Sequence, residues 1–185
     1  RRILLSFTYD DQPVHAGDLK VEGAVTSLLK YALLPNLVQT TEGVPAILHG
    51  GPFANIAQGT NSIMATDLAL KLGDYVVTEA GFGFDLGAEK FFDIVAPYGG
   101  LNPRIVVLVA TVRALKYHAG VAREDLERSN PRAAVLGMAN LRKHYQNIDK
   151  FGIPCIVALN RFAPDTEEEI RAVVRAAAEE GMNIA

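Results

Sequence analysis

The organisation of this chain follows from one segment, Asp74-Tyr75-Val76-Val77-Thr78-Glu79-Ala80-Gly81-Phe82-Gly83-Phe84-Asp85-Leu86-Gly87-Ala88-Glu89-Lys90. The segment opens with β-branched and aromatic residues, a composition that predicts a buried strand over residues 74–78. It closes with residues that predict the start of a helix near Leu86. Between the expected strand and the expected helix lies a turn that contains Gly81, Gly83 and Gly87.

This glycine-rich turn has two interpretations. Glycine adopts positive φ at low cost and has no side chain to hold a ligand away from the backbone. A strand, a glycine-rich turn and a helix N-terminus together point several backbone N–H groups at an anion, which predicts phosphate binding. The alternative is that the glycines only let the helix pack closely on the strand. A Gly-x-Gly pattern alone does not separate the two.

A second glycine-rich turn, in residues 46–57, strengthens the first interpretation. It again has the pattern of a strand, a turn and a helix. Two such turns in one parallel sheet would lie side by side at the carboxyl ends of their strands, where open α/β sheets bind ligands. The pair predicts one anion-binding cradle whose candidate residues are Gly51, Ala54, Asn55, Gly81, Phe82, Gly83 and Gly87.

The rest of the chain alternates expected strands with expected helices. Besides residues 74–78, apolar runs predict strands at residues 3–8, 46–49, 105–110 and 153–159. Apolar residues at helical spacing predict a helix over residues 18–34 and a second one from Met64 to a C-cap at Gly73. A third helix is expected from Asn130-Pro131 to near Gly152. A capping box of Asp165 and Glu168 predicts the start of a fourth, which extends to about Glu180. This alternation predicts one α/β segment over residues 1–185, with a mostly parallel sheet and flanking helices.

Core positions follow from the same spacings. The apolar residues that recur on one face of the expected helices are Val21, Val25, Leu28, Ala32, Met64, Leu68, Leu72, Ala134, Met138, Leu141, Tyr145 and Ile148. The uninterrupted run from Ile105 to Ala110 predicts a strand covered on both faces.

Composition excludes several classes of protein. The chain has 185 residues, of which 49% are hydrophobic and 21% are charged, as in ordinary globular proteins. A net charge of −3 without a basic cluster argues against nucleic-acid binding, and the longest apolar run is too short to cross a membrane. The single cysteine, Cys155, fits a reducing cytoplasm and is expected to be a buried, inert thiol. The chain begins without Met inside an expected strand, which indicates a segment of a longer protein.

Other polar and aromatic residues are weaker candidates. Glu79, Asp85 and Glu89 could hold Mg²⁺ or a monovalent cation, but helix capping and solvated first-turn charges are the favoured explanation. His49 is expected to be a hydrogen-bonded structural group. Phe162 follows a buried strand at the sheet edge, where it either stacks on a planar ligand or packs under its own loop.

Two of these segments resemble signature segments of the formate–tetrahydrofolate ligase family. They are residues 49–57, His-Gly-Gly-Pro-Phe-Ala-Asn-Ile-Ala, and residues 78–91, which include the second glycine turn. Residues 35–40, 109–116 and 160–162 resemble further family segments in the same order, so the likeness covers nearly the whole chain. The chain departs from the family pattern at Gln58, Thr60, Phe84 and Ala163.

The resemblance implies an ATP-dependent ligation of formate to tetrahydrofolate through formyl phosphate, with Mg²⁺ accompanying ATP and a monovalent cation as a further ligand. It implies a P-loop NTPase-like architecture in a longer protein that forms homo-oligomers. No G-x-x-x-x-G-K-S/T pattern occurs in this chain, so the nucleotide loop is expected upstream. Formyl phosphate would lie on the glycine turns, and Phe162 would stack on the folate pterin opposite an aromatic residue from a downstream segment.

Two alternatives stay open at the level of sequence. The segment could come from a larger multifunctional folate enzyme in which the ligase domain is catalytically silent. It could also belong to a regulatory module that binds a nucleotide at the same sheet edge without turnover. An intact upstream P-loop lysine would favour catalysis, and its loss would favour either alternative.

Overall fold

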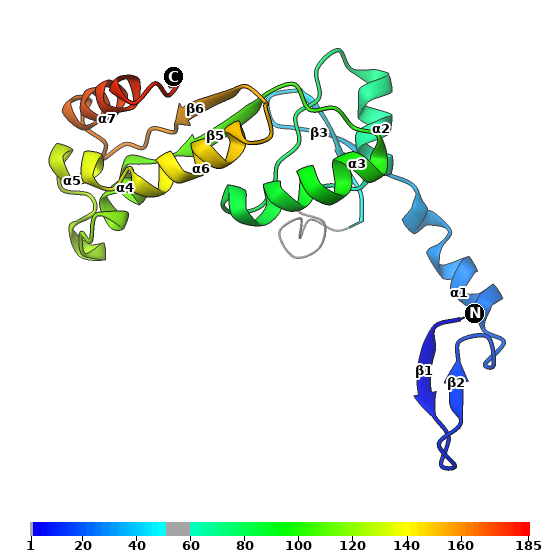
Figure 1. The fold of residues 1–185 in the computed structure, drawn as a ribbon. Coiled ribbons are helices and arrows are strands. Elements are labelled where there is room, and N and C mark those ends of the chain that lie inside the picture. The colour runs from blue at the N-terminus through cyan, green and yellow to red at the C-terminus, as the bar shows by residue number, and fades with distance from the viewer. Residues whose placement is uncertain (1, 51–59) are drawn as a thin grey trace. The chain divides into compact units, whose positions relative to one another are not determined.

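The structure is a computed structural model that describes residues 2–50 and 60–185. The chain divides into two compact units, residues 1–79 and residues 80–185. Figure 1 shows the helices and strands of each unit. The chain is a mixed α/β protein, as its sequence predicts.

In its described residues, the first unit contains two small antiparallel sheets and two α-helices. Its elements are β1 (Leu4–Phe7), β2 (Pro13–His15), α1 (Glu22–Leu29), a 3₁₀ turn (Tyr31–Leu33), β3 (Asn36–Gln39), β4 (Pro45–Leu48) and α2 (Ile63–Leu72). Strand β1 pairs with β2 and β3 pairs with β4. The short connections explain the pairing, because a parallel pair requires a crossover of a dozen or more residues.

The second unit is built around one parallel pair of strands. A helix with π-type turns at Phe84–Ala88 and Phe91–Val95 leads into α3 (Ala96–Gly99). The following elements are β5 (Val106–Ala110), α4 (Val112–His118), a 3₁₀ turn (Arg123–Asp125), α5 (Pro131–Leu136), α6 (Ala139–Asp149), β6 (Cys155–Leu159) and α7 (Glu167–Glu179). Strands β5 and β6 run parallel from Val106 opposite Cys155 to Ala110 opposite Leu159, and Ile184 forms a further parallel bridge with Val157.

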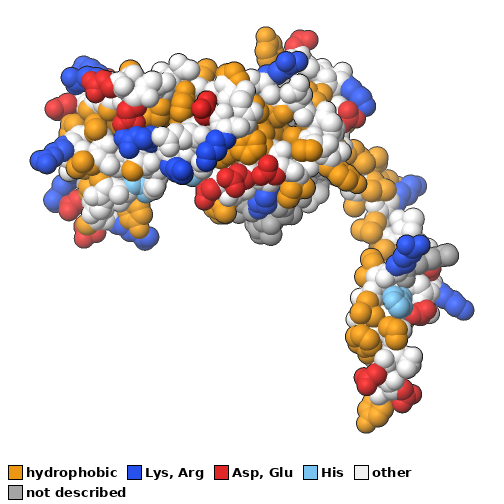
Figure 2. All heavy atoms as spheres, in the orientation of Figure 1, with side chains coloured by type: hydrophobic (Ala, Val, Ile, Leu, Met, Phe, Trp, Pro, Cys, Tyr) orange, Lys and Arg blue, Asp and Glu red, His pale blue; other side chains and the backbone are white. Residues whose placement is uncertain are grey.

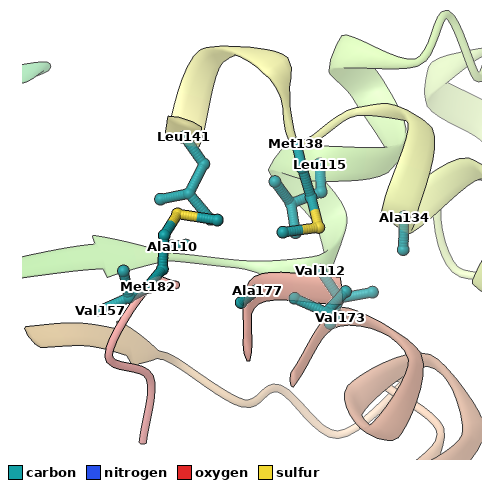
Figure 3. Close-up of a cluster of buried hydrophobic side chains, with 10 residues drawn as sticks. All are labelled: Ala110, Val112, Leu115, Ala134, Met138, Leu141, Val157, Val173, Ala177 and Met182. Atoms are coloured by element: carbon teal, nitrogen blue, oxygen red, sulfur yellow. The ribbon is translucent and has the colours of Figure 1, made fainter. Parts of the chain in front are cut away.

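The core of the second unit joins both strands to helices α4–α7. Figure 3 shows its buried side chains, which are Ala110, Val112, Leu115, Ala134, Met138, Leu141, Val157, Val173, Ala177 and Met182. The break between α5 and α6 occurs at Gly137, where an added Cβ would overlap the carbonyl of Leu115. Gly137 has φ −77° and ψ 2°, so the chain leaves the helical conformation there and the single helix expected after Asn130 is divided.

Several local predictions in the second unit are confirmed. Asn130 caps α5 by accepting a hydrogen bond from the N–H of Ala133, and Pro131 follows it in the first turn. Ala134, Met138, Leu141 and Ile148 are buried as their spacing predicts. The capping box of α7, however, consists of Thr166 and Glu169, one residue later than predicted.

The strand predicted over residues 74–78 is wrong. These residues adopt no regular secondary structure, and the side chains of Tyr75 and Val77 are both 94% exposed. A strand requires a neighbouring strand for its backbone hydrogen bonds. Within the described residues this segment has no such partner.

Predicted burial in the first unit is also wrong. Met64, Leu68 and Leu72 are exposed, and the buried residues of α2 are instead Ala65 and Thr66. Helix α1 is shorter than predicted and buries none of its residues. Figure 2 shows hydrophobic side chains at the surface over the segment from β1 to α1, where Ile3, Leu5, Phe7 and Leu28 are exposed.

The prediction of a mostly parallel sheet is confirmed only in part. One of the three sheets in the described residues is parallel and the two in the first unit are antiparallel. Strand β5 is covered on one face only, since Val107 and Val109 are 57% and 61% exposed. Among the described residues no helix has the length and apolar character needed to span a membrane.

Candidate functional site

The glycine turn before α3 is tightly folded on itself. The helix begins at Phe84, close to the predicted start, and Gly83 is its N-cap residue. Gly83 has φ −71°, so it does not need the conformational freedom of glycine. The residue of this turn with positive φ is Phe82, at φ 61°. An exposed aromatic residue in this conformation is a local strain, and such strain clusters at functional sites.

Gly87 has a packing role that Gly83 does not share. Its N–H donates a hydrogen bond to the carbonyl of Gly81 at 3.1 Å. A Cβ at Gly87 would overlap the backbone N and O of Gly81. Glycine is therefore required here because the helix lies directly against the turn, as the packing interpretation of the sequence anticipates.

The backbone donors of the turn are partly occupied. The N–H of Leu86 donates to the carbonyl of Gly83 at 3.0 Å, and the N–H of Gly87 is used as described above. The first N–H groups of a helix have no partner within the helix. The N–H groups of Phe84 and Asp85 are therefore the candidate donors to an anion at this turn.

His144 of α6 lies against the same turn, and sequence reasoning missed it. Its Nδ1 is 3.9 Å from Oδ1 of Asp85, and its ring carbon Cε1 would lie 3.1 Å from a Cβ at Gly83. Within the described residues, Nδ1 of His144 is buried without a hydrogen-bond partner. Its position on a helix, far along the chain from Gly83, gave no local signal of this neighbourhood.

The first glycine turn cannot be described in the same way. Gly51, Ala54 and Asn55 lie outside the described residues, so their place in an anion cradle stays a prediction. His49, directly before them, is hydrogen-bonded as its structural interpretation predicts. Its Nε2 contacts the carbonyl of Ala32 at 2.8 Å, which makes Nε2–H the donor and leaves Nδ1 to accept from the hydroxyl of Ser62 at 2.7 Å.

Phe162 lies in the loop after β6, separated from the end of the strand by Asn160 and Arg161, and is 50% exposed. The N–H of Asn160 donates to the carbonyl of Ala110 at 2.8 Å, so the loop leaves the sheet beside the end of β5. The half-exposed ring at the carboxyl end of a parallel strand is available to a planar ligand.

The carboxylates named as metal candidates do not form a cluster. Among the residues that the structure describes, no group of three or more His, Cys, Asp or Glu side chains is arranged to hold a metal ion. Asp85 does not cap the helix, since its N-cap residue is Gly83 and no side chain caps it.

A buried thiol and a buried ion pair are structural. Cys155 is buried, as predicted, and burial raises the pKa of its thiol to about 11. Lys116 is 1% exposed, and its Nζ lies 2.8 Å from Oε1 of the fully buried Glu169. Neither group is presented to a ligand.

These features define an α/β protein with a glycine-rich turn at a helix start and an exposed aromatic residue at the carboxyl end of a parallel strand. Proteins of this class bind their ligands at that edge of the sheet. The chain belongs to the formate–tetrahydrofolate ligase family, whose model matches residues 1–185. A formate–tetrahydrofolate ligase from Syntrophus aciditrophicus (strain SB) is 85% identical over 185 residues, which are 100% of this chain and 33% of that relative. The chain thus spans about one third of the curated relative it matches.

Proposed function

We propose that the protein containing this chain ligates formate to tetrahydrofolate at the expense of ATP and forms 10-formyltetrahydrofolate. The observation that carries this proposal is the family match over residues 1–185, together with 85% identity to a relative named as this ligase. The chain would be one α/β segment of the whole enzyme, with a P-loop NTPase-like nucleotide site supplied upstream and part of the folate site supplied downstream.

In the proposed reaction, a formate oxygen attacks the γ-phosphorus of ATP and ADP leaves. A folate nitrogen then attacks the formyl carbon of the resulting formyl phosphate, and phosphate leaves. Backbone donors at a fixed turn stabilise such an anion without reorganising. The N–H groups of Phe84 and Asp85 would supply this stabilisation, beside the candidate residues Gly81, Phe82 and Gly83.

The proposal extends to the ligands and setting of the whole protein. ATP brings Mg²⁺, and a monovalent cation is a further proposed ligand, but none of the described side chains is assigned to hold either ion. The protein is proposed to be a cytoplasmic homo-oligomer that binds small molecules. A catalytically silent ligase-like domain and a nucleotide-binding regulatory module are the competing proposals, and the name of the close relative favours the active ligase.

Phe162 is proposed to stack on the pterin ring of tetrahydrofolate. Its ring is half exposed, so the ring has free surface for a ligand and is not simply part of the core. Stacking of a base on an aromatic residue, a chemical analogue, contributes about 1–3 kcal/mol. Loss of that contact corresponds to roughly a 5- to 140-fold change in affinity, which is about one to two orders of magnitude.

The test is steady-state kinetics of the full-length protein with each substrate varied in turn. Wild-type protein should form 10-formyltetrahydrofolate from formate, ATP and tetrahydrofolate. Phe162→Ala should raise the KM for tetrahydrofolate by roughly one to two orders of magnitude and leave the KM for ATP and formate unchanged.

Tyr117→Ala is the matched control, because Tyr117 is 48% exposed on α4. It should leave all three KM values unchanged. An inactive wild-type protein would contradict the proposed ligase function. An active protein whose folate KM is unchanged in Phe162→Ala would remove Phe162 from the folate site.

A further inference from the structure

The loop between β6 and α7 holds the backbone of Phe162 in a fixed position. The N–H of Phe162 donates a hydrogen bond to Oδ2 of Asp165 at 2.8 Å. In the opposite direction, the N–H of Asp165 donates to the carbonyl of Phe162 at 3.0 Å. These two reciprocal bonds close the turn at both ends and fix the direction in which the Phe162 side chain leaves the backbone.

Asp165 is buried while Phe162 is exposed. Asp165 is 8% exposed and Phe162 is 50% exposed. Burying a carboxylate is costly unless hydrogen bonds or charges compensate it. The N–H of Phe162 supplies one hydrogen bond, and the adjacent N-terminus of α7 favours a negative charge. Among the described residues Asp165 forms no ion pair, so the hydrogen bond from the N–H of Phe162 is the directed interaction of its carboxylate.

The residues that follow Asp165 anchor this turn to the core. Thr166 caps α7 and forms a capping box with Glu169, whose Oε2 accepts from the N–H of Thr166 at 2.9 Å. The other oxygen of Glu169 pairs with the buried Nζ of Lys116 at 2.8 Å and accepts from the N–H of Asn130 at 2.9 Å. Asp165 therefore connects the backbone of the exposed Phe162 to the capping box of α7 and, through Glu169, to the buried ion pair with Lys116.

We propose that Asp165 is a positioning residue for folate binding, which acts by fixing the backbone of Phe162. The proposal rests on the proposed function, in which Phe162 stacks on the pterin. Asp165 itself does not touch the substrate. Stacking requires the ring to project from a defined backbone position, and the reciprocal hydrogen bonds fix that position before the ligand arrives.

The test compares three substitutions of Asp165 in the full-length protein. Asp165→Ala removes the acceptor and should raise the KM and the Kd for tetrahydrofolate by roughly two- to tenfold, the change expected for one lost hydrogen bond. The KM for ATP and formate should not change. Asp165→Asn keeps an acceptor oxygen and should restore the folate constants to within about twofold of wild type.

Asp165→Glu keeps the charge but moves the acceptor by one methylene group. It should weaken folate binding as Asp165→Ala does, which separates the position of the oxygen from its charge. If Asp165→Ala does not fold, the comparison of Asp165→Glu with Asp165→Asn carries the test. Val173→Ala is the stability control, because Val173 is a fully buried core residue of α7 and should lower the Tm without changing the folate constants.

The Kd for tetrahydrofolate, measured by isothermal titration calorimetry, keeps this test separate from the proposed activity. If wild-type protein binds folate but makes no product, the ligase function fails while the Kd values still judge Asp165. If Asp165→Ala or Asp165→Glu lowers the Tm as Val173→Ala does but leaves the folate Kd unchanged, the positioning role is overturned. Equal weakening by Asp165→Asn and Asp165→Ala overturns it as well.

Discussion

Gly83 and Gly87, two glycines of one turn, have different physical roles in this structure. Gly87 has no room for a Cβ because the backbone of Gly81 occupies that space. A Cβ at Gly83 would instead lie 2.6 Å from Oδ1 of Asp85, a side-chain atom that can rotate away. A side chain at position 87 is therefore blocked by backbone atoms, whereas a side chain at position 83 meets a carboxylate that can rotate away.

Gly87→Ala should therefore destabilise the full-length protein more than Gly83→Ala. Overpacking against a backbone that cannot move costs typically about 1–3 kcal/mol. At Gly83 the carboxylate of Asp85 moves at lower cost, so a smaller change in Tm is expected. Thermal melts of the two variants measure this difference.

Activity assays of the same pair address the anion cradle. If the cradle lies at this turn, Gly83→Ala should reduce kcat although its Tm stays close to that of wild type, because a methyl group on the N-cap residue would intrude where the backbone is meant to approach the anion. Equal Tm losses in both variants would show that the packing argument is wrong. Unchanged kcat in Gly83→Ala would place the cradle elsewhere.

At the scale of elements, a buried ion pair joins α4 to α7. Burial raises the pKa of Glu169, but hydrogen bonds from Lys116, from the N–H of Asn130 and from the N–H and hydroxyl of Thr166 outweigh it. The pKa falls from its ordinary value of 4.5 to about 2. A carboxylate whose pKa is lower in the folded state stabilises that state above its unfolded pKa, and this contribution is lost as pH falls toward the folded pKa.

Glu169→Gln should lower the Tm of the full-length protein at neutral pH, because it leaves the buried Lys116 without a charged partner. The stabilisation at stake is on the order of 3 kcal/mol. The difference in Tm between wild type and variant should stay constant down to about pH 5 and narrow progressively as the pH falls from about 4.5 toward 2. Thermal melts across this range measure the difference.

Glu167→Gln is the matched control for this titration. Glu167 pairs with Arg161 at 2.5 Å, but both side chains are more than half exposed. Exposed pairs contribute about 0–1 kcal/mol, so this variant should change the Tm little at any pH. A Tm difference for Glu169→Gln that does not narrow in acid would show that the ionised carboxylate is not the stabilising species.

The sequence predicts elements well where the deciding interaction is local. Asn130 and Pro131 specify the start of α5 because the cap bond spans three residues. Asp165 and Thr166 are both suitable N-cap residues, and the choice falls on Thr166, whose partner Glu169 is held by Lys116 from α4. Non-local contacts also explain the misses: residues 74–78 find no strand partner among the described residues, and His144 reaches Gly83 only through tertiary packing.

At the scale of the whole molecule, the two units differ in how much apolar surface they bury. The buried core clusters of the described residues lie in residues 80–185. In residues 2–50, Ile3, Leu5, Phe7, Tyr31 and Leu37 are all more than half exposed. The proposed site is also incomplete in this chain. The chain carries candidate residues for formyl phosphate and folate but no P-loop motif.

Residues 1–185 alone should therefore form no 10-formyltetrahydrofolate. Without a G-x-x-x-x-G-K-S/T motif the segment has no loop of this kind to hold the phosphates of ATP, and Phe162 would supply one side of the folate site. The assay incubates purified segment with formate, Mg-ATP and tetrahydrofolate, with full-length protein as the positive control. Circular dichroism and a thermal melt of the segment verify that residues 80–185 keep their core, so that inactivity reflects missing groups and not unfolding. Turnover by a folded segment free of full-length protein would show that its own residues bind ATP, and that the nucleotide site does not lie upstream.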